Sequence, residues 1–157
     1  MSDEEKIKQQ LEEKFSFLNG IIAIKRKGRI FADVPLDKFE QVFDYVVIQL
    51  QFDAISTITG MDEGDSFLVI YHLHRKGSII LNLKVKVSKE NPTIKSVTSV
   101  FPSAEMYERE LMDLLGMKVD GLPEGRRYPL PDDWPKDEHP LLKDWKKDNL
   151  GQEMKNE

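Results

Sequence analysis

The stretch SFLVIYHLHRKGSIILNLKVKVS, residues 66–88, decides the fold. In its second half, every odd-numbered position from Ile79 to Val87 is apolar, whereas the positions between them are mostly polar. This period of two predicts a β-strand with one buried face. Residues 66–74 have the β-branched and apolar character of a neighbouring strand, and the turn residues at 75–78 join the two into a hairpin.

On both sides of this hairpin, the same kinds of pattern predict an α+β domain. Apolar spacing predicts helices over residues 7–18 and 39–50, and strands over residues 21–25, 29–34, 54–59 and 95–100. Asn19-Gly20 is a stop signal for the first helix. We therefore expect a two-layer fold with a mainly antiparallel sheet and helices packed on one side.

The composition changes at Gly121. Five of the eight prolines lie between Pro123 and Pro140, and proline neither continues a helix nor donates to an interior sheet ladder. We expect an α+β domain over residues 1–120 and an extended, proline-rich C-terminal interface tail over residues 121–157, frayed at its end. The tail contains both tryptophans, which need a surface to lie on.

Composition also excludes several classes of site. The chain has no cysteine, so it cannot hold a thiolate-ligated cluster or form a disulfide. A net charge of −5 argues against nucleic acid, and the basic run at residues 25–29 is interpreted as a solvated hairpin turn around Gly28. His72 and His74 share a strand face, but two histidines without a third ligand usually pack rather than bind metal.

No apolar stretch reaches the roughly 20 residues of a membrane-spanning helix, and the first residues, MSDEEKIKQQ, lack the features of an export signal. We therefore expect a cytoplasmic protein.

The segment SAEMYERELMDLLG, residues 103–116, predicts a helix with Ser103 as N-cap and Gly116 as terminator. Glu108 falls at the margin of its apolar arc, where a carboxylate needs a basic partner. Three interpretations remain open at this point: a surface helix with ion pairs, a catalytic carboxylate cluster, and a helix that contacts another protein.

The run SVTSVFPSAEMYERELMDLLGMKVDGLPEGRRYPLPDDWPKDEHPLLKDW, residues 96–145, resembles the C subunit of respiratory complex I, the thirty-kilodalton subunit, and its counterpart in membrane-bound NiFe hydrogenases. The matching motifs are the Ser-Val-Thr strand end, the Tyr-Glu-Arg-Glu helix, the paired arginines, the Asp-Asp-Trp step and His-Pro-Leu. Leu122 stands where complex I subunits usually have histidine, and Leu142 where they usually have arginine. These departures favour the hydrogenase-type branch.

The resemblance implies a non-redox accessory subunit of a membrane-associated, ion-translocating oxidoreductase. Such a subunit docks on the large catalytic subunit of the NiFe-hydrogenase type and is needed for assembly. Iron–sulfur clusters and possibly NiFe would belong to partner subunits, among them iron–sulfur small subunits, with no cofactor in this chain and no nucleic acid. The chain would lie on the inner face of the cell membrane and contact it only through those partners.

Within the family, the sequence favours a ferredoxin-dependent, hydrogen-evolving hydrogenase. The alternative is the C subunit of a NADH/quinone or sulfur-reducing complex I-like enzyme. An alternative of another class is a free-standing, carboxylate-based α+β enzyme that uses Glu108 or Glu110 as a general base.

The resemblance assigns no catalytic, cofactor-binding or metal-binding residue to this chain. It implies a partner interface formed by charged residues of the helix and by arginines, acids and an aromatic anchor of the tail. The expected interface residues are Glu108, Arg109, Glu110, Asp113, Arg126, Arg127, Asp132, Asp133, Trp134, His139, Pro140 and Lys143.

Overall fold

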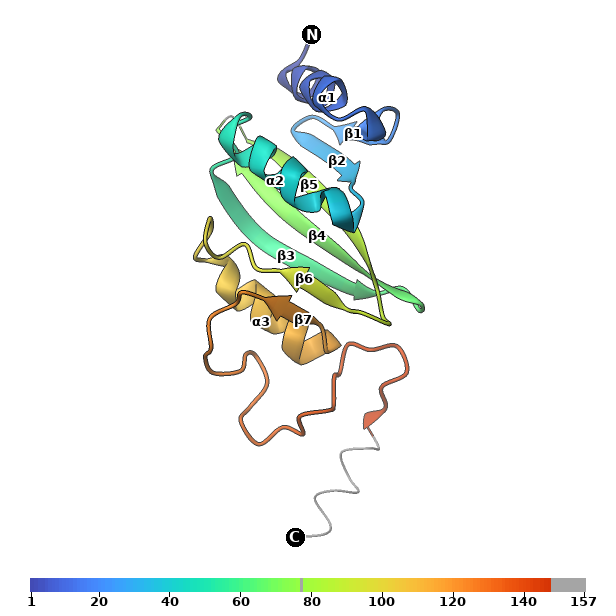
Figure 1. Cartoon of the computed structure of the whole chain (residues 1–157), viewed down its shortest axis with the longest axis vertical. Coiled ribbons are helices and arrows are strands. Elements are labelled where there is room, and N and C mark those ends of the chain that lie inside the picture. The colour runs from blue at the N-terminus through green and yellow to red at the C-terminus, as the bar shows by residue number, and fades with distance from the viewer. Residues whose placement is uncertain (77, 148–157) are drawn as a thin grey trace. The chain divides into compact units, whose positions relative to one another are not determined.

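The computed structural model describes residues 1–76 and 78–147 (Figure 1). Gly77 of the predicted hairpin turn and the predicted frayed end lie outside the described residues. The helices and strands of the described chain are α1 (Asp3–Lys14), β1 (Ile22–Arg26), β2 (Arg29–Asp33), α2 (Phe39–Ile48), β3 (Ala54–Asp62), β4 (Ser66–Arg75), β5 (Ile79–Ser88), β6 (Thr93–Lys95), α3 (Ala104–Leu115) and β7 (Lys118–Asp120). Short 3-10 helices occupy Ser16–Leu18 and Leu36–Lys38.

The main sheet has five strands in the order β1-β2-β5-β4-β3 and is mainly antiparallel, which confirms the predicted α+β class. One pairing breaks the antiparallel pattern, because β2 runs parallel to β5 with Ile30 opposite Leu81. Along β5, residues 79, 81, 83, 85 and 87 are all buried, as the period of two predicts.

Two local predictions were wrong, and one short strand was not predicted. The first helix ends at Lys14, because Phe15 is extended at its C-cap and a 3-10 turn follows. The strand predicted over residues 95–100 is only the short β6, since the chain leaves the strand direction at Ser96 to bond a residue of α3. The unpredicted β7 pairs in parallel with β6 and has three residues, too few to show a period.

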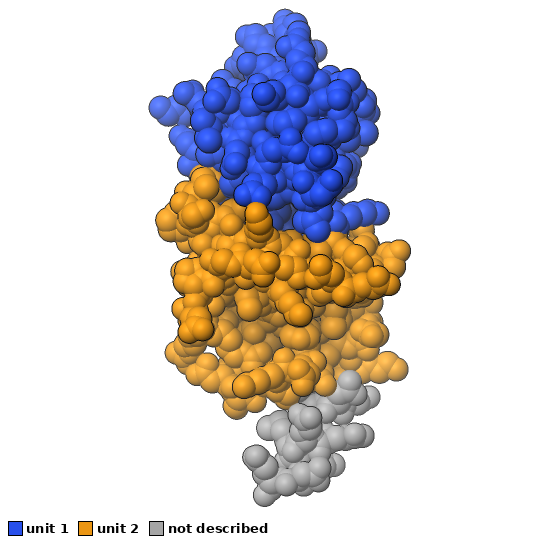
Figure 2. Space-filling view, viewed as in Figure 1, with its two compact units in different colours: residues 1–59, 68–86 blue, residues 60–67, 87–157 orange. Residues whose placement is uncertain are grey.

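The described chain forms two compact units, coloured separately in Figure 2. Unit 1 contains residues 1–59 and 68–86, and unit 2 contains residues 60–67 and everything described from Val87 onward. In unit 1, α2 packs on β4 through aromatic rings, with centroids 4.5 Å apart for Phe39 and Tyr71 and 6.4 Å apart for Phe43 and Tyr71. The domain boundary predicted at residue 120 stays a prediction.

Helix α1 is attached to unit 1 by a buried carboxylate. Glu4 is 8% exposed, and its Oε1 accepts the backbone N–H of Gly28 at 2.5 Å. Hydrogen bonds from backbone N–H groups hold the pKa of Glu4 below its ordinary value. At its start, α1 has a complete capping box formed by Ser2 and Glu5.

Gly28 is the residue that allows the β1–β2 turn to lie against the β4–β5 turn. Its φ is +72°, and a Cβ placed there would lie 2.9 Å from the backbone oxygen of Ser78. The contact is closed by the N–H of Ile80, which donates to the Gly28 carbonyl at 2.9 Å.

We predict that Gly28→Ala lowers the free energy of unfolding by about 3 kcal/mol, because a left-handed alanine costs about 1–2 kcal/mol and the methyl group also meets backbone. Gly20→Ala is the matched control, since Gly20 has φ +77° with nothing near its Cβ position. Urea denaturation of both variants measures the difference. Equal losses in the two would refute the steric role of Gly28.

Candidate functional site

Helix α3 is the element around which unit 2 is built. A Cβ on Gly60 of β3 would collide with the side chains of Leu111 and Leu115, so this glycine permits close packing of the helix. Gly116 ends the helix with φ +73°, as predicted. Ser103 occupies the N-cap position, but its backbone is helical and its side chain makes no capping hydrogen bond, contrary to the prediction.

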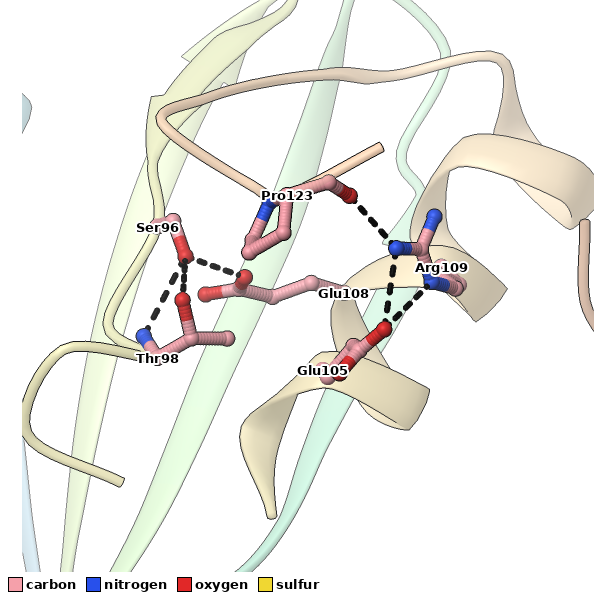
Figure 3. A network of polar contacts seen from close by, with 6 residues as sticks. All are labelled: Ser96, Thr98, Glu105, Glu108, Arg109 and Pro123. Atoms are coloured by element: carbon pink, nitrogen blue, oxygen red, sulfur yellow. Dashed lines mark hydrogen bonds and ion pairs between the residues drawn. The ribbon is translucent and has the colours of Figure 1, made fainter. Parts of the chain in front are cut away.

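Glu108 of α3 is fully buried, with a relative exposure of 0%. Its Oε2 accepts the hydroxyl of Ser96 (Figure 3) and its Oε1 accepts the backbone N–H of Val97, both at 2.7 Å. The Ser96 oxygen also contacts the hydroxyl of Thr98 at 2.7 Å. Burial raises the pKa of Glu108, and the two donors oppose this effect only in part.

The expectation that a basic residue would meet Glu108 directly is not what the structure shows, because neutral donors satisfy both carboxylate oxygens. Arg109 contributes only a longer-range attraction that lowers the Glu108 pKa. The consequence is structural: Glu108 fixes residues 96–98 to α3.

The next residue, Arg109, fixes the chain on the other side of the helix. Its Nε and Nη2 donate to Glu105 Oε1 at 3.1 and 2.9 Å, and its Nη2 also donates to the carbonyl of Pro123 (Figure 3). A Cβ on Gly125 would lie 2.6 Å from the same nitrogen, so only glycine fits there without a shift. The Arg109 side chain is 9% exposed and therefore acts mainly within the chain.

Asp113 binds the segment that follows. Its Oδ1 accepts from Arg127 Nε at 3.0 Å, and its Oδ2 accepts the backbone N–H of Leu130 at 3.0 Å. Arg127 also donates to the carbonyl of Trp134 at 2.7 Å. The backbone carbonyl of Asp113 accepts from His139 Nδ1 at 2.8 Å, so this one residue contacts four positions between residues 127 and 139 directly or through Arg127.

Two further contacts order the segment itself. Trp134 and Trp145 stack with ring centroids 6.2 Å apart, and both indole N–H groups donate to Glu138. Arg126 forms a two-bond pair with Asp132, at 3.1 and 2.6 Å, which raises the pKa of Arg126 and lowers that of Asp132. Unlike the buried contacts of Glu108, Arg109 and Asp113, this pair is exposed to solvent. The relative side-chain exposure is 81% for Arg126 and 62% for Asp132.

Sequence reasoning missed Asp62, which ends β3. Its Oδ1 pairs with Lys89 Nζ at 2.6 Å and accepts the N–H of Gly64 at 2.8 Å, while its Oδ2 accepts the N–H of Lys143 at 3.0 Å. The bond from Lys89 and the two N–H groups lower the pKa of Asp62 from 3.8 to about 2. The local turn Asp-x-Gly signals the bond from Gly64, but nothing in the sequence signals Lys89 or Lys143.

A hollow in unit 2 gathers several of the predicted interface residues. It is lined by Met112, Asp113, Gly116, Met117, Arg127, Asp132, Lys136 and His139. The ring of His139 lies directly against Gly116, where a Cβ would be 2.7 Å from it. The hollow therefore joins the C-terminal end of α3 to the proline-rich segment.

The predicted interface residues fall into three classes of exposure. The buried class is Glu108, Arg109 and Asp113, the half-buried class is Glu110, Arg127, Trp134, His139 and Pro140, and the exposed class is Arg126, Asp132, Asp133 and Lys143. Their role against a partner stays a prediction. From Gly121 to Lys147 the described chain has no α-helix or β-strand.

The remaining candidate, the pair His72 and His74, lies in unit 1. His72 Nδ1 donates to Asn82 Oδ1 at 2.6 Å, because the Asn82 amide nitrogen already donates to the Ile30 carbonyl, and His72 Nε2 lies 2.8 Å from Thr59 Oγ1. His72 therefore belongs to a hydrogen-bonded network. Over residues 1–76 and 78–147, no group of three or more His, Cys, Asp or Glu side chains is arranged to hold a metal.

In the same described residues, no helix is both long enough and apolar enough to cross a membrane.

Comparisons with known proteins agree on one family. The family model "Respiratory-chain NADH dehydrogenase, 30 Kd subunit" matches residues 32–149. The C subunit of the F(420)H(2) dehydrogenase of Methanosarcina mazei is 34% identical over 146 residues, covering 91% of this chain and 92% of that protein. The beta subunit of the membrane-bound hydrogenase of Pyrococcus furiosus is 26% identical over 153 residues, covering 93% and 88%.

Among solved structures, a chain of "the membrane-bound sulfane sulfur reductase (MBS), an archaeal respiratory membrane complex" has a TM-score of 0.79 and 20% identity, and the match covers 99% of this chain and 93% of that one. At this identity the likeness shows a shared fold.

We predict that Glu108→Ala lowers the free energy of unfolding by about 3 kcal/mol, because the buried Val97 N–H loses its acceptor and a cavity remains. Glu108→Gln is the matched control, since it keeps an acceptor and nearly the same volume. A raised folded-state pKa destabilises the ionised form, so Glu108→Gln should gain stability relative to wild type as pH rises from 4.5 towards 7. Denaturation across that range measures both effects, and a pH-independent difference would contradict the second.

For Asp62, the pH dependence of the stability contribution has the opposite sign to that of Glu108. Its folded-state pKa of about 2 lies below the ordinary 3.8, so its stabilisation is present above 3.8 and disappears as pH falls towards 2. We expect Asp62→Asn to be less stable than wild type at pH 6, with the gap closing between pH 4 and pH 2. Thermal unfolding at stepped pH measures the gap. A gap that persists at pH 2 would show that the carboxylate charge is not its cause.

Proposed function

The chain belongs to the family of the 30 kDa subunit of respiratory-chain NADH dehydrogenase, and on this premise we propose that it is a non-redox accessory subunit that docks on a NiFe-hydrogenase-type large subunit and is needed for assembly. Family membership makes it the C subunit of a complex I-like oxidoreductase complex. We further propose that it lies on the cytoplasmic face of the membrane, which it meets only through its partners.

One observation supports docking best: three polar residues of α3 hold the neighbouring loops in place through hydrogen bonds. Glu108 holds residues 96–98, Arg109 holds Pro123, and Asp113 holds Arg127 and Leu130. A surface that is ordered before binding loses less conformational entropy when it meets a partner. Such an irregular but well-bonded segment suits a rigid docking surface.

The exposure classes separate two roles within the proposed surface. Buried Glu108, Arg109 and Asp113 are positioning residues, because each is hydrogen-bonded within the chain. The exposed pair Arg126–Asp132 can exchange its internal bonds for contacts across an interface. Exposed apolar side chains on the same unit, Met112, Tyr128 and Leu141, would supply apolar contact area.

For the type of complex we propose a ferredoxin-dependent, hydrogen-evolving hydrogenase, because Leu122 and Leu142 replace the polar residues usual in complex I. The second candidate is a dehydrogenase-type complex, which the higher identity to the C subunit of the F(420)H(2) dehydrogenase favours, 34% against 26% for the hydrogenase relative. Sulfur-reducing and NADH/quinone types are further alternatives. Purified complex assayed with reduced ferredoxin, reduced F420 and NADH shows which donor is oxidised, and measurement of hydrogen, sulfide and reduced quinone shows which acceptor is used.

The alternative of another class, a free-standing enzyme using Glu108 or Glu110, finds little support in the geometry. Both oxygens of Glu108 are occupied and the side chain is inaccessible to a substrate. Glu110 is half-buried and does not line the hollow at the end of α3. An assay in which the isolated chain turns over any of the complex's substrates would revive this alternative.

We predict that Arg126→Ala weakens co-purification with the large subunit about tenfold, with little change in melting temperature, because the Arg126 side chain is exposed to solvent. Arg127→Ala is the informative contrast: it should lower the melting temperature, since Arg127 is bonded to Asp113 and Trp134. Lys38→Ala, an exposed cation of unit 1, serves as the control. Unchanged recovery of the large subunit with Arg126→Ala would count against this docking surface.

A further inference from the structure

Two turns far apart in the sequence bring five cationic side chains together at one end of unit 1. The β1–β2 turn supplies Lys25, Arg26 and Lys27, and the end of β4 supplies Arg75 and Lys76. The turns are joined through Gly28 and Ser78, because Arg29 Nη1 donates to both of their carbonyls, at 2.8 and 3.3 Å. We call these five residues the basic cluster.

Within the described chain the basic cluster is used only in part, because the charge of Lys27 helps to lower the pKa of Glu4. Four of its members are exposed and Arg75 is half-buried, and none of the five forms a salt bridge with any residue in the ranges 1–76 and 78–147. The buried carboxylate Glu4 already accepts the N–H of Gly28. The exposed cations of the cluster therefore remain accessible to a partner.

Arg75 and Lys76 also line a hollow together with Val47, Gln51 and Asp53. Its wall therefore combines two cations with an amide, an acid and an apolar side chain. Such a mixed lining matches the patterned surface of a protein better than a uniformly charged surface.

We propose that the basic cluster docks an acidic surface of a second protein of the complex, at a site separate from the α3 surface. Carboxylates of that protein would lie against the cations of the two turns, and Arg75 and Lys76 would bind them at the wall of the hollow. A uniformly anionic lipid surface fits less well, because α1 of the same unit begins with Asp3, Glu4 and Glu5. The chain's net charge of −5 disfavours nucleic acid in the same way.

Zero-length carbodiimide coupling of the purified complex, read by mass spectrometry, tests the contact. We expect Lys25, Lys27 or Lys76 to be joined to aspartate or glutamate of another protein of the complex, and to be protected from amine acetylation. All three lysines uncoupled and freely acetylated in the assembled complex would overturn the proposal while leaving docking through α3 intact. Recovery of the chain without any partner would overturn both.

A matched pair of double variants gives an independent measurement. The test variant, Lys27→Gln with Lys76→Gln, removes one cation from each turn, and the control, Lys8→Gln with Lys38→Gln, removes two cations of unit 1 outside the cluster. Each is titrated against assembled complex from which the wild-type chain has been dissociated after purification. We expect the test variant to bind about tenfold more weakly near 0.1 M salt and the control less than twofold.

Near 1 M salt the screening length falls to about 3 Å, and the difference between the variants should vanish. Equal affinities for the two double variants at low salt would overturn the proposal. The same variants are mixed with phosphatidylglycerol vesicles and with short duplex DNA. Binding to either probe that depends on the cluster, without a difference against the complex, would assign the cluster to lipid or nucleic acid instead of a protein.

Discussion

The hydrogen bonds of the buried residue Asp113 are the interactions on which unit 2 most depends. Its carboxylate receives Arg127 and the N–H of Leu130, and its backbone carbonyl receives His139. Residues 121–147 contain no α-helix or β-strand, so their backbone groups bond within local turns, to α3 and to Asp62. Asp113 of α3 fixes residues 127–139, and Asp62 fixes the chain at Lys143.

Glu108 and Arg109 extend the same principle to the two chain segments that flank α3. Adjacent residues on a helix point about 100° apart, so one side chain reaches residues 96–98 while the other reaches Pro123. Burying these charges is costly unless hydrogen bonds satisfy them, and here each has at least two partners. The helix sequence that resembles an interface motif thus first serves the chain's own architecture.

This distinction changes how a charged family motif is interpreted. In a docking protein, a charged residue can contact the partner or can hold the surface that does, and only burial separates the two roles. Arg126 and Arg127 are neighbours in sequence, yet one is 81% exposed and the other is 20% exposed and bonded to Asp113. The first suits partner contact and the second suits positioning. The basic cluster, in contrast, has exposed cations that form no salt bridge within the described residues.

The elements with a clear period could be predicted from the sequence alone: β5 from its alternating residues 79–87, and α2 and α3 from apolar spacing. These patterns reflect local geometry, so they are readable without knowing the neighbours. The sequence also placed Asp113, Arg126 and Arg127 in one candidate site. Tertiary structure alone decided that Glu108 is buried against residues 96–98, that β7 pairs with β6, and that two basic turns meet at Gly28 and Ser78. Each of these depends on contacts between residues that are distant in sequence. The free energy of such contacts cannot be inferred from a local periodic pattern.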